Sequence, residues 1–261
     1  MHPFQHDFIV AEHDSRLHRV IKVSGGKLTH EFKIEWPLDL QSLPDGHVLL
    51  SANRAIVELD ANFREVWRYD QKRAAIFSCQ KRPDGNILFG DASRAAICEV
   101  NPAKRIVRQF DFPLVAEPHE YLHAFRLIRA TDNDGVLIAA HDAKKLIGCD
   151  WAGAIVWQAD LPGTPYMPIQ LPGGNILVSL GPSGLIVEVN RAGQIVWQYD
   201  MTADNQLPRG WIAGMSVLPD GHIVYSDSTY DRLVEIDRDH NLVALYEDRN
   251  ILLHPSTHII L

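Results

Sequence analysis

The stretch LPGGNILVSLGPSGLIVEVNRAGQIVWQYD (171–200) decides the fold. It holds three short runs rich in Ile, Val and Leu, separated by turns that contain Gly, Pro, Asn and Ser. Such runs, bounded by such residues, are typical of β-strands. The opening Pro-Gly-Gly supplies one fixed φ followed by residues that tolerate positive φ, as a tight hairpin requires. The stretch therefore predicts successive antiparallel strands.

Both halves of this stretch recur along the chain. The turn phrase appears five times, as LPDGHVLL (43–50), RPDGNILF (82–89), DNDGVLIA (132–139), LPGGNILV (171–178) and LPDGHIVY (218–225). A strand phrase follows each copy, as REVWRYD (64–70), RIVRQFD (105–111), AIVWQAD (154–160), QIVWQYD (194–200) and NLVALYED (241–248). The two phrases stay 23 to 25 residues apart, and successive units start 39, 50, 39 and 47 residues apart. This period is typical of four-stranded propeller blades.

The two ends of the chain complete the count. Residues 7–35 match the last three strands of a unit, whereas HPSTHIIL (254–261) matches an inner strand alone. Joining them removes the open sheet edge of the array. We therefore predict an all-β fold in one domain, 1–261: a six-bladed β-propeller of four-stranded antiparallel blades, closed by N-terminal strands plus a C-terminal inner strand. The expected blades are 7–35 plus 254–261, 37–70, 76–111, 121–160, 166–200 and 212–248.

Composition narrows the class of partner. The chain has 46% hydrophobic and 22% charged residues, and no apolar run approaches the roughly 18 residues of a spanning helix. Its net charge of −8 disfavours nucleic acid, so we expect neither a nucleic-acid nor a membrane partner. The start of the sequence lacks the pattern of a secretory signal, and three cysteines suit reduced thiols. We expect a cytoplasmic protein, or a periplasmic one if a signal peptide was removed.

The outer-strand phrases GQIVWQYD (193–200), GAIVWQAD (153–160) and REVWRYD (64–70), combined with LPxGNxLV, resemble known repeats. They are similar to the PQQ-like (quinoprotein-type) and arylsulfotransferase-like propeller repeats, with NHL-type six-bladed propellers as relatives. The resemblance covers nearly the whole chain and implies the propeller fold. We interpret the repeated Trp as packing between neighbouring blades. The sequence does not assemble the aromatic, cationic and Ca²⁺-binding residues that a quinone needs, so the resemblance gives no evidence for quinone binding and the cofactor stays unknown.

Any functional site is expected where inner strands start and second strands end, because these segments meet around the axis of a propeller. They are rich in His and Asp, which can transfer protons or bind metal. The predicted catalytic residues are His123, His254 and His258. The predicted ligand-binding residues are His119, Tyr121, Arg126, His141, Tyr166, Arg209 and Trp211. A divalent cation, if present, would use Asn53, Asp91, Asp142 and Asp227.

Two functions remain open at this stage. The favoured one is a soluble recognition module that binds a small ligand or a protein partner on its His-lined axial face. The alternative is a hydrolase, lyase or transferase that uses axial His, with or without a divalent cation. Within it, a lactonase-like site would hold the cation, and the arylsulfotransferase resemblance implies a His nucleophile with a second His and an Arg. The enzyme requires several histidines to converge on one point.

Overall fold

The Pro-Asp-Gly and Pro-Gly-Gly motifs form tight hairpin turns. The computed structural model of the chain describes residues 2–13, 17–114 and 124–261. Gly85 and Gly221 adopt φ of 85° and 90° in two of these hairpins, a region open to glycine and costly for residues with a side chain. In the hairpin at Pro44–Gly46 the chain makes one 3₁₀ turn, η1. Each hairpin returns the chain antiparallel beside the strand it has just left.

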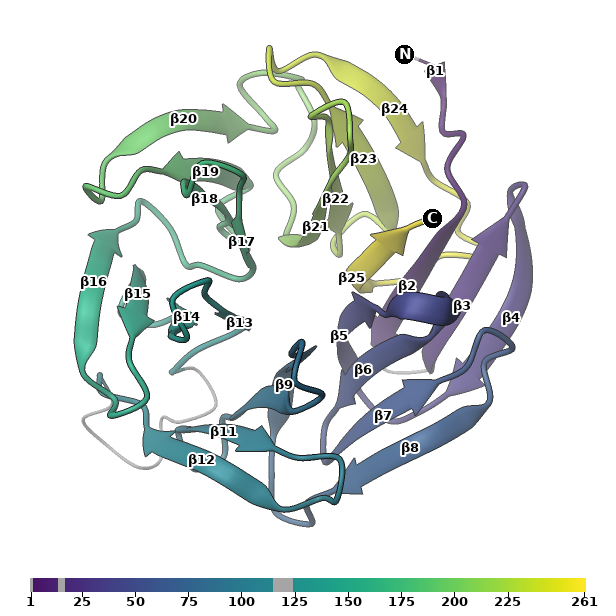
Figure 1. Cartoon of the computed structure of the whole chain (residues 1–261). Coiled ribbons are helices and arrows are strands. Elements are labelled where there is room, and N and C mark those ends of the chain that lie inside the picture. Colours follow the sequence, from purple (N-terminus) through teal and green to yellow (C-terminus); the bar gives the residue numbers. More distant parts are fainter. Residues whose placement is uncertain (1, 14–16, 115–123) are drawn as a thin grey trace.

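Six sheets stand around a central axis, each running from an inner to an outer strand (Figure 1). Blade 1 consists of β25 (Pro255–Ile260), β2 (Phe8–His13), β3 (His18–Ser24) and β4 (Lys27–Lys33), and blade 2 of β5 (Pro37–Ser42), β6 (Val48–Ala52), β7 (Ala55–Leu59) and β8 (Glu65–Asp70). Blade 3 consists of β9 (Ile76–Lys81), β10 (Ile87–Asp91), β11 (Ala96–Val100) and β12 (Ile106–Asp111), and blade 4 of β13 (Ile128–Ala130), β14 (Val136–Ala140), β15 (Lys145–Cys149) and β16 (Ile155–Asp160). Blade 5 consists of β17 (Pro168–Gln170), β18 (Ile176–Ser179), β19 (Leu185–Val189) and β20 (Ile195–Asp200), and blade 6 of β21 (Ile212–Val217), β22 (Ile223–Asp227), β23 (Arg232–Ile236) and β24 (Leu242–Tyr246).

Blade 1 joins the two ends of the chain. Its inner strand β25 pairs antiparallel with β2, placing His258 opposite Val10 and Ile260 opposite Phe8. The predicted six-bladed propeller, closed by N-terminal strands and a C-terminal inner strand, is thus confirmed. The sequence did not indicate the short strand β1 (His2–Pro3), which pairs in parallel with β24 on the outer edge of blade 6. The N-terminal segment therefore contacts both blades that meet at the closure.

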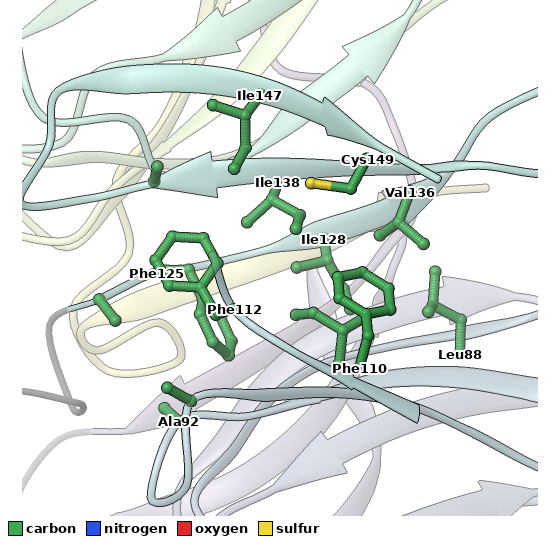
Figure 2. Packing of buried hydrophobic residues seen from close by; sticks show 14 of the residues in the cluster. Leu88, Ala92, Phe110, Phe112, Phe125, Ile128, Val136, Ile138, Ile147 and Cys149 are labelled. Atoms are coloured by element: carbon green, nitrogen blue, oxygen red, sulfur yellow. The ribbon is translucent and has the colours of Figure 1, made fainter. Parts of the chain in front are cut away.

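The hydrophobic core is divided into layers that lie between blades. Six clusters of buried residues each draw their members from two adjacent blades, so every blade interface has its own layer. Figure 2 shows the layer between blades 3 and 4, in which Phe125 and Phe112 lie near Ile138. Their rings meet edge to face with centroids 5.3 Å apart. Burial of apolar side chains between sheets is what holds the six blades in a ring.

One side chain fixes the turn before the outer strand in five blades. In each, an Asp or Asn Oδ1 accepts a hydrogen bond from the backbone N–H four residues later, at 2.8 to 3.0 Å. Asp and Asn favour such turns because the side chain replaces a backbone acceptor. These turns set the register of the outer strands that follow. The residues are Asp60, Asn101, Asp150, Asn190 and Asp237.

The repeated Trp of the outer strands links neighbouring blades, which agrees with the interblade packing role inferred from the sequence. The indole N–H of Trp67 donates to the carbonyl of Pro102, that of Trp157 to Arg191, and that of Trp197 to Arg238. In every case the acceptor belongs to the next blade along the chain. Blade 3 has Arg108 instead, whose guanidinium lies over the ring of Trp151 in blade 4 at 5.0 Å.

We expect Trp157→Phe to lower the free energy of unfolding by about 1 kcal/mol, because it removes one interblade hydrogen bond while keeping a large ring. The measurement is the urea midpoint at unchanged slope. Trp151→Phe is the matched control, since the indole nitrogen of Trp151 has no hydrogen-bond partner among the described residues. Equal losses in the two variants would show that packing alone, and not the hydrogen bond, stabilises this interface.

Candidate functional site

All six blades contribute to a pocket of about 610 Å³ at one end of the axis. Every blade places in it at least one residue that lies within two positions of the start of its inner strand. Residues at the ends of β2 and just after β22 complete the wall. The lining residues are His13, Trp36, Leu38, Phe77, Arg126, Leu127, Tyr166, Trp211, Ser228, Thr229 and His254. Because the strand starts converge at the axis, the repeat itself builds this pocket.

Four of the eleven described lining residues are Trp, Phe or Tyr: Trp36, Phe77, Tyr166 and Trp211. The rings of Tyr166 and Trp211 meet at 90° with centroids 6.2 Å apart. A hydrogen bond fixes the Tyr166 side chain, because its hydroxyl lies 2.7 Å from Ser256 Oγ. The backbone N–H of Trp211 donates to the hydroxyl of Thr229 at 3.0 Å. These bonds hold two walls of the pocket in place before any ligand arrives.

Arg126 brings a permanent charge into this apolar environment. Its guanidinium carbon lies 5.5 Å from the centre of the Phe77 ring, in the range of a cation–π contact. Burial lowers the pKa of Arg126 from its usual value, and arginine nevertheless stays protonated in proteins. No Asp or Glu lines the pocket within the described part of the chain. Among the described lining residues Arg126 is therefore the one permanent charge, and Asp142, which lies outside the pocket, attracts it electrostatically.

Two histidines meet at the edge of the pocket. The rings of His13 and His254 lie edge to face with centroids 4.6 Å apart. His254 has a φ of 46° and Trp36 a φ of 52°, a conformation that is strained for large side chains. Each of these residues immediately precedes an inner strand: His254 precedes β25, and Trp36 precedes β5. Both residues line the pocket.

The second predicted catalytic histidine of this strand lies elsewhere. His258 is buried within β25, where its Nδ1 lies 2.8 Å from Ser226 Oγ, and it lines a separate cavity of about 860 Å³. Burial lowers the pKa of His258 to about 3, so the ring is neutral near pH 7. His254 and His258 therefore face different cavities.

We expect His258 to make the protein less stable in acid. Below pH 6.5 the unfolded chain protonates this histidine, whereas the native state resists protonation until about pH 3. The unfolded state then binds more protons, so the free energy of unfolding falls with falling pH over that range, by up to about 1.4 kcal/mol per unit. Urea unfolding at pH 7, 6 and 5 measures this slope, and His258→Gln should flatten it.

His222 provides the control of opposite sign. A hydrogen bond to Glu235 raises the pKa of His222, so its contribution is present at low pH and is lost as the pH rises through the raised value. His222→Gln should therefore steepen the loss of stability in acid. An unchanged slope in His258→Gln would contradict the burial effect.

Three polar side chains that line the larger cavity, Gln41, Gln80 and Arg129, have hydrogen-bond partners on other inner strands. Gln41 pairs with the backbone of Lys81, accepting from its N–H at 2.6 Å and donating to its carbonyl at 3.3 Å. Gln80 Oε1 accepts from the N–H of Ala130 at 2.7 Å. The guanidinium of Arg129 donates to both oxygens of Asp39, at 2.7 and 2.8 Å. These side chains join the inner strands of blades 2, 3 and 4, and we assign them a structural role.

The predicted metal ligands do not share a site. Buried Asp91 and Asp227 each bind the arginine of their own hairpin, Arg94 at 2.7 Å and Arg232 at 2.8 to 2.9 Å. Asp142 is half exposed and lies 2.9 Å from a ring nitrogen of His141, and neither these acids nor Asn53 line the pocket. In the ranges that the structure describes, no three His, Cys, Asp or Glu side chains are grouped as a metal site would need.

The remaining predicted residues divide into two groups. Arg209 is half exposed, binds the carbonyl of Ser183 and lies outside the pocket, as does His141. His119, Tyr121 and His123 lie outside the described residues. Of the predicted positions, the pocket therefore brings together Arg126, Tyr166, Trp211 and His254.

Sequence reasoning did not select Trp36 or Phe77 for the site. The sequence does contain a signal for both, because each lies within two positions of the start of an inner strand, as Tyr166 and Trp211 do. Four blades thus have an aromatic residue near the start of the inner strand, so the signal is a feature of the repeat. It becomes recognisable once the strand starts are aligned by the hairpins that follow them.

These features define a six-bladed β-propeller with an aromatic pocket at one end of its axis. A protein of unknown function from Bacteroides caccae has the same fold, with a TM-score of 0.84 and 20% identity over 99% of both chains. A streptogramin B lyase matches 98% of this chain and 87% of its own, with a TM-score of 0.68 and 13% identity. The WD40 propeller domain of Doa1 matches 85% of this chain and 72% of its own, with a TM-score of 0.65 and 14% identity.

At these identities the comparisons show the fold alone. No protein-family model matches the chain, and no curated protein matches it in sequence. The expected PQQ-like or arylsulfotransferase-like family is not confirmed. Among the described residues, none lies in a helix long and apolar enough to cross a membrane.

Proposed function

We propose that the protein is a recognition module that binds a small ligand in the aromatic pocket. The observation that carries this proposal is the convergence of all six blades on one cavity with four aromatic walls. A volume of about 610 Å³ suits a small organic molecule. A protein partner would instead bury roughly 800 Å² on each side, which favours a broad surface over a pocket.

A fragment screen by ligand-observed NMR tests this proposal. Aromatic fragments should bind the wild-type protein and raise its melting temperature, since a ligand that binds only the native state stabilises it. Trp211→Ala should weaken binding at least about tenfold, because an aromatic wall is lost. Trp36→Ala is a second variant of the same wall, and it is structurally milder because Trp36 is 43% exposed.

Val156→Ala is the control for this screen. Val156 is 68% exposed on the outer strand of blade 4, away from the axis, so its removal should leave fragment binding unchanged. Failure of every fragment to bind, or equal binding by the wild-type protein and both Trp variants, would rule out the pocket as a ligand site.

A second candidate function is acid–base chemistry on the bound ligand. The observation that favours it is the imidazole pair of His13 and His254, 4.6 Å apart at the pocket edge, since histidine can donate or accept a proton near neutral pH. Lyases are also among the proteins of the same fold, including a virginiamycin B lyase from Staphylococcus aureus studied with quinupristin (TM-score 0.67, 12% identity, 94% of this chain and 86% of its own).

Quinupristin is therefore a reasonable first substrate. Its consumption, followed by liquid chromatography, should be fast in the wild-type protein and lost in His254→Ala if the pair is catalytic. His141→Ala serves as the control because His141 lies outside the pocket. No consumption of quinupristin or of any pocket-binding fragment would leave recognition as the function.

A further inference from the structure

The charges that line the aromatic pocket indicate what kind of ligand it suits. Arg126 is the one permanently charged side chain among the described lining residues. A histidine side chain carries no negative charge near neutral pH, so neither His13 nor His254 opposes an anion. The chain as a whole has a net charge of −8, so the positive charge of Arg126 is a local feature. A cationic ligand would be repelled there, whereas an anionic one would be attracted.

Arg126 is placed to bind a flat anion. Its guanidinium is largely buried, and the central carbon of that group lies 5.5 Å from the centre of the Phe77 ring. Charge interactions strengthen in such a low-dielectric environment. A guanidinium has five N–H donors in a fixed fork that fits the two oxygens of a carboxylate. An anionic ligand can therefore share this group with other partners of Arg126.

The aromatic and apolar lining indicates which group the uncharged part of the ligand contains. Trp36, Phe77, Tyr166 and Trp211 come from blades 2, 3, 5 and 6, so aromatic faces stand on several sides of the cavity. Leu38 and Leu127 add apolar surface. Flat rings bind such walls by stacking and edge-to-face contacts. The described lining thus combines a large apolar surface with one cationic point.

We propose that the ligand is an aromatic carboxylate, with its ring held between the aromatic walls and its carboxylate bound by Arg126. This inference rests on the proposed function, since it names the ligand class of the same pocket. It is specific, because a neutral aromatic of the same shape should bind less well and a cationic one worse still. Charge-assisted hydrogen bonds to a carboxylate correspond to a preference of about 10- to 100-fold.

Isothermal titration with matched probe pairs tests the inference. The probes are benzoate, 2-naphthoate and indole-3-acetate, each against its own primary amide, with 2-naphthylmethylammonium as the cation. Every carboxylate that binds should do so at least about tenfold more tightly than its amide in the wild-type protein. In Arg126→Gln this preference should fall to about one, while the affinity for the amides stays within about twofold. Arg126→Lys should retain part of it, because charge remains and the fork is lost.

Arg209→Gln is the matched control, because Arg209 lies outside the pocket and is half exposed; it should keep the full preference. Equal binding of carboxylates and amides, or a preference that survives in Arg126→Gln, would overturn the inference and leave the proposed function intact. Binding of neutral fragments without binding of any carboxylate would likewise overturn the inference and leave the proposed function intact. If neither the carboxylates nor any fragment of the screen binds, both proposals are wrong.

Discussion

Asp39→Ala should lower the free energy of unfolding by about 3–5 kcal/mol, because it leaves the guanidinium of Arg129 in the interior without its carboxylate. Asp39 is fully buried on β5. It accepts from the Ser78 hydroxyl at 2.9 Å, from the Cys79 N–H at 3.1 Å and from both ends of the Arg129 fork. One carboxylate thus joins the inner strands of blades 2, 3 and 4. Chemical unfolding monitored by circular dichroism measures the loss.

Two further variants separate the ion pair from simple truncation. Asp39→Ala combined with Arg129→Met should recover part of the stability, because replacing both members of a buried pair costs less than removing one. Asp70→Ala is the surface control: its carboxylate is 63% exposed and lies 3.3 Å from Arg68, so its loss should cost less than about 1 kcal/mol. A loss in Asp39→Ala no larger than that in Asp70→Ala would show that this pair does not hold the inner strands.

Phe125→Ala should cost about 3–5 kcal/mol, because it opens a cavity in the layer between blades 3 and 4. Phe125 is fully buried, and its ring fills the space that a side chain at Gly90 would need, as a Cβ there would lie 2.5 Å from the ring. For a chain of this size the loss corresponds to a fall in melting temperature of about 10 °C. The backbone of Arg126 directly follows, so weaker binding of carboxylate probes should accompany the loss.

A double-mutant cycle tests the contact itself. Gly90→Ala alone should destabilise the protein, because the Phe125 ring must move to admit the new methyl group. In the Phe125→Ala background the same substitution should be tolerated, since the ring is gone. Residues in contact show such coupling, whereas distant residues add independently. Additive losses would mean that Gly90 and Phe125 do not compete for the same space.

The repeat could be predicted fully from the sequence because its causes are local. Hairpins depend on Pro, Asp and Gly at fixed offsets, and strands depend on apolar runs of a few residues. The turns at Asp60, Asn101 and their counterparts are local too, with a bond to the backbone four residues on. The closure also followed from counting, since residues 254–261 supply the one strand that the N-terminal unit lacks.

The lining of the candidate site could be predicted only in part. Its location at the starts of the inner strands followed from the architecture, and Arg126, Tyr166, Trp211 and His254 lie there. Trp36 was missed because the second blade was expected to begin at residue 37, one position after it, whereas the structure places its ring in the pocket wall. The metal hypothesis placed Asp91 and Asp227 together because both stand where a second strand ends, whereas in the structure each carboxylate binds the arginine of its own blade.

The sequence by itself determined the blade, the number of blades and the way the ring closes, because short-range turn chemistry and apolar periodicity specify each unit. Only the tertiary structure decided which side chains share a cavity. His254 and His258 show the difference: their spacing of four places both on one side of an ideal strand. The positive φ of His254 breaks that alternation at the start of β25. One imidazole therefore lines the aromatic pocket and the other is buried beside Ser226, because the direction of a side chain at a strand end depends on how six blades pack around the axis.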